Sequence, residues 1–216
     1  MKVPAPPLWL LGLLALFQLS IALQEFAPAS CPGEVPRHIV ATSSTPRASI
    51  ASEEILRPFE FAGDAGPALN VSAQAQSNPV SGGQSSVAMA VNYLTGKQLR
   101  DEDIDSTYGF ALLEALKEEC RPAGYTWRDA GDLDASSWTL IRSKLLVERM
   151  PVILALNGEH FSPTGRGQIV LVTGICGESV LYIDPADGLW HTTTRQLIEA
   201  SETHPDGKFI FVAETL

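Results

Sequence analysis

The chain has 216 residues, of which 45% are hydrophobic and 19% charged, and its 15 basic and 25 acidic residues give a formal charge of -10. This composition excludes bulk disorder, which requires few apolar residues and a high density of charge. It also argues against nucleic-acid binding, because so acidic a chain does not readily form the basic stripe that neutralises phosphates.

The first 22 residues have the pattern of a secretory signal peptide. Lys2 supplies the positive start, the 15 residues of 8–22 form an apolar run, and Ser20–Ala22 fit the small-x-small rule for cleavage. The alternative, a membrane anchor, needs about 20 apolar residues and usually a basic flank, whereas Gln24 and Glu25 follow here. We therefore predict cleavage after residue 22, a secreted or periplasmic product, and no membrane attachment once the signal is removed.

Residues 23–68 are predicted to form a flexible leader segment. They are rich in Pro, Ala, Ser and Thr and lack hydrophobic periodicity apart from a short stretch at 53–56. A second cleavage site could follow Ala29. The domain itself is predicted over residues 69–216. Asn70–Ser72, near its start, form an N-glycosylation triplet that has meaning only in a eukaryotic secretory pathway.

The three cysteines are too few for a disulfide scaffold and lack the paired spacing of a zinc site. Export would permit disulfides. Cys120 and Cys176 both fall inside the predicted domain and could pair, while Cys31 lies in the leader. The alternative is that all three cysteines are reduced, and the sequence does not decide between the two.

Helices are predicted in the first half of the domain. Apolar residues recur at helical spacing over 84–94, with Gly96 as a stop signal, over 110–120, and over 138–148 after a serine cap. The acidic loop at 101–105 is interpreted as a solvated approach to a helix, because it lacks the residue order of a calcium loop. Trp127 and Trp138 are expected in the core or at its rim.

Strands are predicted in the second half, over 152–156, 168–173, 180–183 and 209–212, with a tight turn at 176–178 and a short helix at 194–200. Helices followed by strands indicate an α+β fold in which the helices pack on an antiparallel sheet. The strands are almost continuously apolar, which favours burial on both faces or a curved half-barrel.

This order of elements resembles the papain-like cysteine peptidases, in particular the bacteriocin-leader-processing (double-glycine) peptidases and the plant-pathogen effector peptidases. In those families a Gln stands six residues before a catalytic Cys, which opens a helix reading approximately Cys-Gly-Pro-Ala-Ser-Leu-Ala-Met-x-x-Asn-Tyr. Here Gln76 is followed by a helix that contains Ala88–Met89 and Asn92–Tyr93, and this register puts Gly82 at the nucleophile position.

Further motifs of the families follow in the expected order, so that the resemblance covers roughly residues 70–214. Trp138 to Leu145 precede a Pro-Val-Ile strand at 151–153. The strand at 168–174 begins with Gln168 where the families have a His, and Asp184 with the next proline closes the following strand.

The resemblance implies a thiolate at a helix N-terminus, an imidazole that holds its proton, an Asp that orients the imidazole, and a Gln amide that stabilises the oxyanion. Gln76 and Asp184 match the last two roles. Gly82 has no side chain to attack with, and the amide of Gln168 does not accept a proton near neutral pH. We therefore predict an inactive homologue that binds a peptide or protein in the retained cleft, where Gly82 is expected to leave open space.

Two alternatives stay open. One is a working hydrolase with Ser81 as a displaced nucleophile and His160 as its base, although a serine without a positioned base is a weak nucleophile. The other is a structural secreted domain whose cleft is filled by its own leader, residues 30–68. The remaining histidines, His38, His191 and His204, are assigned to the leader, a strand and a turn. No metal or cofactor is predicted, since no HExxH, CxxC or GxGxxG motif occurs.

Overall fold

The computed structural model of the chain describes residues 68–105 and 109–216. The predicted signal peptide, the leader up to residue 67, Cys31 and the proposed filling of the cleft by the leader lie outside these residues. Among the helices of the described part, none is both long and apolar enough to cross a membrane.

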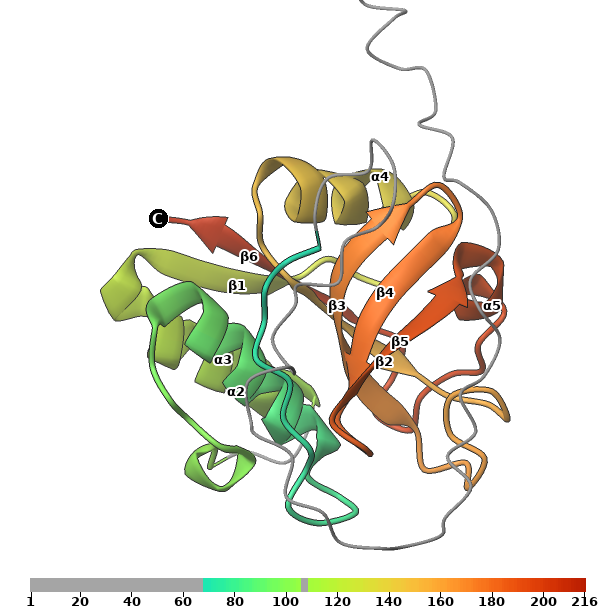
Figure 1. Cartoon of the computed structure of the whole chain (residues 1–216), viewed down its shortest axis with the longest axis horizontal. Coiled ribbons are helices and arrows are strands. Elements are labelled where there is room, and N and C mark those ends of the chain that lie inside the picture. The colour runs from blue at the N-terminus through green and yellow to red at the C-terminus, as the bar shows by residue number, and fades with distance from the viewer. Residues whose placement is uncertain (1–67, 106–108) are drawn as a thin grey trace, which may run out of the picture.

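Two helices lie side by side on one flank of the domain (Figure 1). Helix α2 spans Gly82–Thr95 and α3 spans Gly109–Cys120. Helix α2 packs between α3 and strand β3 (Gln168–Cys176), which explains why five successive residues, 87–91, are all buried. Its predicted end at Gly96 is confirmed, because Gly96 adopts a left-handed φ of 74° and donates its N–H to the carbonyl of Asn92.

The third predicted helix is split into two parts. Helix α4 covers Ser137–Arg142, and a π-helical turn continues it over Ser143–Val147. Inside this wider turn the Lys144 side chain is buried, and its ammonium pairs with the Glu148 carboxylate at 2.6 Å. Short 3-10 turns occur at Asp101–Asp103 and Arg121–Ala123, and helix α5 covers Arg195–Glu199.

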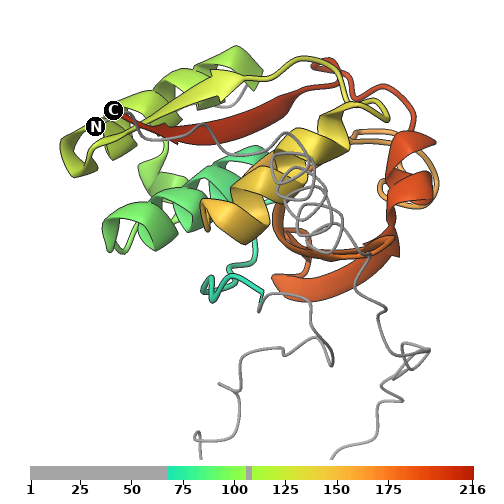
Figure 2. The same cartoon turned by 90° about the horizontal axis from the view of Figure 1, so that it is seen from above.

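The described strands form one antiparallel sheet of six strands in the order β1-β6-β2-β3-β4-β5. Besides β3, they are β1 (Tyr125–Asp129), β2 (Val152–Leu156), β4 (Ser179–Asp184), β5 (Leu189–Thr194) and β6 (Ile210–Thr215). A register shift between Val172 and Gly174 interrupts the pairing of β3 with β4, and this end of the sheet curves strongly in Figure 2. The predicted α+β class and the antiparallel sheet are confirmed.

The cysteines follow neither predicted alternative. Cys120 is a free, fully buried thiol whose sulfur accepts the indole N–H of Trp127 at 3.2 Å. Burial raises the pKa of the Cys120 thiol, and the hydrogen bond from Trp127 opposes that rise. Cys176 is disulfide-bonded, so its partner is not Cys120.

Candidate functional site

Gly82 marks the centre of the predicted site, at the first residue of α2. A Cβ atom placed on Gly82 would lie 2.8 Å from Gln76 Oε1 and 3.4 Å from Gln168 Nε2. Both amide side chains therefore converge on the point where a nucleophilic side chain would begin. The expected open space at Gly82 is only partly present, because the Gln76 amide oxygen lies within 2.8 Å of the place of a Cβ atom.

Gln168 and Asp184 meet because the strands that carry them are neighbours and antiparallel. Gln168 opens β3 and Asp184 ends β4. The Gln168 Nε2 atom donates a hydrogen bond of 2.6 Å to Asp184 Oδ1, and the same oxygen accepts the backbone N–H of Ala186 at 2.8 Å. The amide thus takes up the contact with Asp184 that an imidazole N–H makes in a peptidase of the predicted kind.

The segment that precedes α2 holds Gln76 against this pair. The backbone N–H of Gln76 donates to the carbonyl of Pro185 at 2.7 Å, directly after Asp184. The Gln76 Oε1 atom is buried and has no hydrogen-bond partner among the described residues. Gly188 permits this close approach, because a Cβ there would lie 2.6 Å from the backbone nitrogen of Ala75. The structure therefore brings together all four predicted positions: 76, 82, 168 and 184.

Ser81 is not placed to replace the missing nucleophile. Its side chain is 2% exposed, and its hydroxyl donates to Asp101 Oδ2 while it accepts the backbone N–H of Asn78. His160, in contrast, is exposed, contacts the ring of Phe161 edge-on, and lies 3.5 Å from the Thr193 hydroxyl. No hydrogen bond joins Ser81 and His160 in the described structure.

The acidic loop at 101–105 is not merely solvated, as was predicted, because Asp101 is buried in it. Its carboxylate accepts hydrogen bonds from the Ser81 hydroxyl and the Ser77 backbone N–H. Burial alone would raise the pKa of Asp101, but the hydrogen bonds from Ser81, Ser77 and Glu102 together lower it below its usual value. The carboxylate thus anchors the turn that leads into α2.

Replacing Asp101 with Ala should lower the free energy of unfolding at pH 7 by about 1–3 kcal/mol, because buried hydrogen-bond donors lose their acceptor. A carboxylate with a lowered pKa stabilises the fold above its unfolded pKa, and this contribution disappears as the pH falls through the folded value. The difference between wild type and variant should therefore shrink in urea titrations below about pH 4. Asp105→Ala, at an exposed position, is the control and should show little change at either pH.

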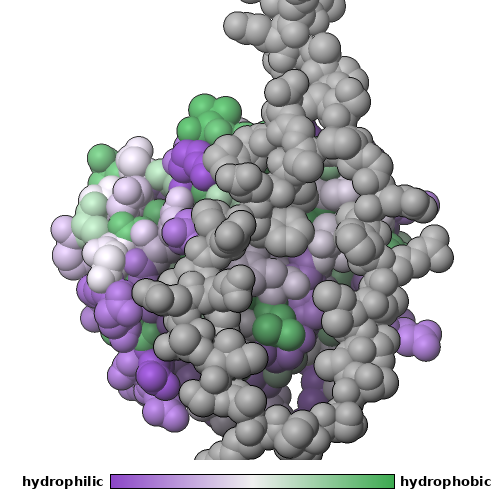
Figure 3. All heavy atoms as spheres, viewed as in Figure 1, coloured by the Kyte–Doolittle hydropathy of each residue, from purple (hydrophilic) through white to green (hydrophobic). Residues whose placement is uncertain are grey.

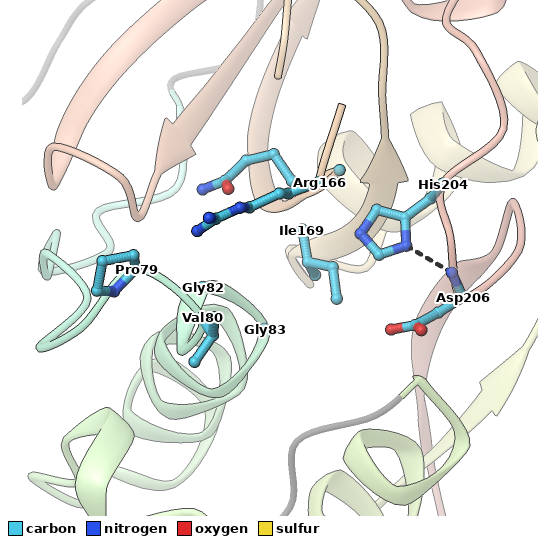
Figure 4. A pocket seen from close by; sticks show the side chains of 10 residues that line it. Pro79, Val80, Gly82, Gly83, Arg166, Ile169, His204 and Asp206 are labelled. Atoms are coloured by element: carbon cyan, nitrogen blue, oxygen red, sulfur yellow. Dashed lines mark hydrogen bonds between the residues drawn. The ribbon is translucent and has the colours of Figure 1, made fainter. Parts of the chain in front are cut away.

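A pocket of about 130 Å³ lies directly beside Gly82. Figure 4 shows the Arg166 side chain reaching across it towards Pro79, and the ring of His204 facing it from the other end. The lining residues are Pro79, Val80, Gly82, Gly83, Arg166, Gly167, Gln168, Ile169, His204 and Asp206.

His204 is a site residue that the sequence did not single out, since the surrounding His-Pro-Asp-Gly predicts a simple turn. In the structure it is only 7% exposed, and its Nδ1 atom accepts the backbone N–H of Asp206 at 3.0 Å. Burial lowers the pKa of His204, which the nearby Asp206 carboxylate opposes. Gly167 makes room for the ring, because a Cβ there would overlap the imidazole of His204.

A second pocket, of about 230 Å³, shares Asp206 with the first and is lined also by Phe110, Lys208 and Phe209. In the coloured part of the face in Figure 3, apolar residues stand in small separate groups among hydrophilic ones. The described residues contain no group of three or more His, Cys, Asp or Glu side chains placed to hold a metal ion. Because Gly82 and Gln168 line the pocket of about 130 Å³, this pocket and the four converging positions together form the candidate site.

The fold is that of a papain-like peptidase domain. The peptidase domain of Streptococcus ComA, a bi-functional ABC transporter involved in a quorum sensing pathway, superposes with a TM-score of 0.50 at 14% identity, over 68% of this chain and 99% of that one. A double glycine motif protease from an AMS/PCAT transporter, in complex with its leader peptide, gives 0.49 at 16% identity, over 69% and 94%. A C39-like peptidase from Bacillus anthracis gives 0.47 at 18% identity, over 67% and 96%.

The superposition on the ComA peptidase domain confirms, as a likeness of fold, the papain-like resemblance that the motifs indicated. No model of a known protein family matches the sequence, and no curated protein matches it. The similarity to the plant-pathogen effector peptidases stays a prediction.

Proposed function

We propose that this chain is a catalytically inactive peptidase-like protein that binds a peptide in the cleft beside Gly82. The observation that carries the proposal is the convergence of Gln76, Gly82, Gln168 and Asp184, with a glycine and an amide at the two positions that covalent catalysis requires. Covalent catalysis needs a nucleophile and a base that takes its proton. Gly82 supplies no nucleophile, and Gln168 supplies only an amide, which is not a base near neutral pH.

Peptide binding is supported by the donors and the pocket that surround this point. Helix α2 has no acidic residue in its first turn, and its N-cap Ser81 makes no side-chain capping bond because its hydroxyl is engaged with Asp101. The first N–H groups of a helix are unpaired within the helix and favour carbonyl oxygens or anions. A peptide chain presents such oxygens at regular spacing, and the pocket of about 130 Å³ gives one of its residues a place.

We also propose that the protein is exported after cleavage near residue 22, and that residues 69–216 form its functional domain. The disulfide at Cys176 supports export, because stable disulfides are typical of oxidising compartments and rare in the cytosol. The apolar start of the sequence supports it independently.

The protein without residues 1–22 should retain peptides from a casein digest without cleaving them. Bound peptides are identified by mass spectrometry after incubation, together with labelling by a fluorophosphonate and by iodoacetamide. Gln168→Trp fills the cleft beside Gly82 and should abolish retention, whereas Gln196→Trp, at an exposed position of α5, should not. Turnover that is lost in Ser81→Ala would overturn the assignment as inactive, and equal retention by Gln168→Trp would overturn the cleft as the binding site.

A further inference from the structure

The pocket beside Gly82 has a cationic end and an acidic end. At one end the Arg166 guanidinium lies over the start of α2, and it forms no ion pair with another described residue (Figure 4). At the other end Asp206 lines the pocket below His204. The positive end of the helix dipole adds to the field of Arg166, because α2 has 14 residues and no acid in its first turn.

His204 provides a second, independent sign that the pocket receives a ligand. Its Nδ1 atom accepts an N–H from Asp206, so the neutral ring carries its proton on Nε2. The Nε2–H group makes no hydrogen bond to any other described residue, although the side chain is only 7% exposed and faces the pocket. This donor opens into the pocket, so an acceptor atom of a ligand in the pocket would pair with it.

We propose that this pocket binds the C-terminal carboxylate of a peptide, held by Arg166 and the N–H groups of Gly82 and Gly83, with His204 donating to the next acceptor of the ligand. This assignment rests on the proposed function, because it names the part of the peptide that occupies the cleft.

The charges and the size of the pocket select this ligand. Asp206 repels a second negative charge, which favours a monoanionic carboxylate over a phosphate. The cavity of about 130 Å³ is close to the roughly 150 Å³ that receives a benzene ring, so it accommodates one terminal residue with a small side chain. Because the whole chain carries a charge of -10, its long-range field does not attract an anion, and affinity must come from these local donors.

The test uses two forms of one peptide library. Hexapeptides randomised at the first five positions and ending in Ala are made as free acids and as C-terminal amides. Both are passed over the immobilised protein and quantified by mass spectrometry. The acid form should be retained about tenfold better than the amide form, because a charge-assisted bidentate contact exceeds a neutral hydrogen bond by this order. Arg166→Gln should bring the ratio of acid to amide retention close to one. Arg121→Gln removes the same charge at an exposed position elsewhere and should leave this ratio unchanged.

Each outcome decides a different point. Equal retention of acids and amides by the wild type would overturn the carboxylate assignment while peptide binding stands. Retention of neither form would overturn both proposals. If Arg166→Gln leaves the ratio of acid to amide retention unchanged, the C-terminal carboxylate does not bind in this pocket. His204→Gln, compared with wild type by thermal melting to confirm folding, should lower retention of both forms several-fold.

Discussion

The double variant Gly82→Cys/Gln168→His is expected to carry a thiol that iodoacetamide alkylates at pH 6 about tenfold or more faster than the thiol of Gly82→Cys alone. The new cysteine would open α2, where the helix dipole and the unpaired N–H groups favour a thiolate. A His at position 168 would take the proton from the thiol. Its ring N–H would donate to the Asp184 carboxylate, which in the native protein accepts the Gln168 amide at 2.6 Å.

The size of the effect follows from the ionised fraction of the thiol. A fall of two units in the thiol pKa raises this fraction at pH 6 about a hundredfold, and lower intrinsic nucleophilicity offsets part of the gain. The Cβ of the introduced cysteine would lie 2.8 Å from Gln76 Oε1, so the amide end must shift or turn its nitrogen towards the sulfur. The rotation would place an amide donor where an oxyanion hole needs one.

The measurement is the second-order alkylation rate, read by mass spectrometry of the intact protein. Gly82→Cys/Gln168→Asn is the matched control, since Asn has the polarity of Gln and no basic nitrogen. Cys120 is buried and should react in the native protein in none of the variants. If the Asn control alkylates as fast as the His variant, position 168 does not face position 82 as described, and the interpretation of the site fails.

Trp127→Ala is expected to lower the free energy of unfolding by about 4 kcal/mol, in the range for large-to-small changes in a core. Trp127 is 1% exposed, pairs with Ala213 across β1 and β6, and gives its indole N–H to the Cys120 sulfur. Its removal leaves a cavity between α3 and the edge of the sheet, and breaks the contact that fixes both.

Urea unfolding monitored by circular dichroism measures this loss. Trp190→Ala is the control, because Trp190 lies on β5 and is only partly buried, so its loss should be about 1 kcal/mol or less. Trp127→Phe keeps most of the volume and provides a value if the Ala variant does not fold. Equal losses for Trp127→Ala and Trp190→Ala would contradict the placement of Trp127 in the core.

The parts of the site that lie on regular elements could be predicted from the sequence. The apolar pattern predicted a helix over 84–94, and the register of the family resemblance through Ala88–Met89 and Asn92–Tyr93 singled out Gly82, which is the first residue of α2. The predicted pair of neighbouring strands then required Gln168 and Asp184 to meet, because an antiparallel hairpin returns the end of one strand to the beginning of the other.

Other parts could not be predicted because their contacts depend on the tertiary structure. Strands β1 and β5 are edge strands that are only partly buried, so they lack the continuous apolar run by which the inner strands were predicted, although His191 of β5 was assigned to a strand. The role of Asp101 depends on Ser81, which is twenty residues away, and that of His204 on Gly167, which lies on another loop. Periodicity describes neighbours along one element, and these pairs join different elements.

The position of β6 has a consequence for the order in which the domain can fold. This last described strand lies between β1 and β2, so Val212 pairs with Arg128 on one side and Val152 on the other. Until residues 210–215 have been synthesised, β1 has no partner and β2 has only one. Contacts so distant in sequence form slowly. The edges of β1 and β2 that β6 joins therefore stay unpaired with each other until residues 210–215 are available, which makes the last described strand the one that closes the sheet.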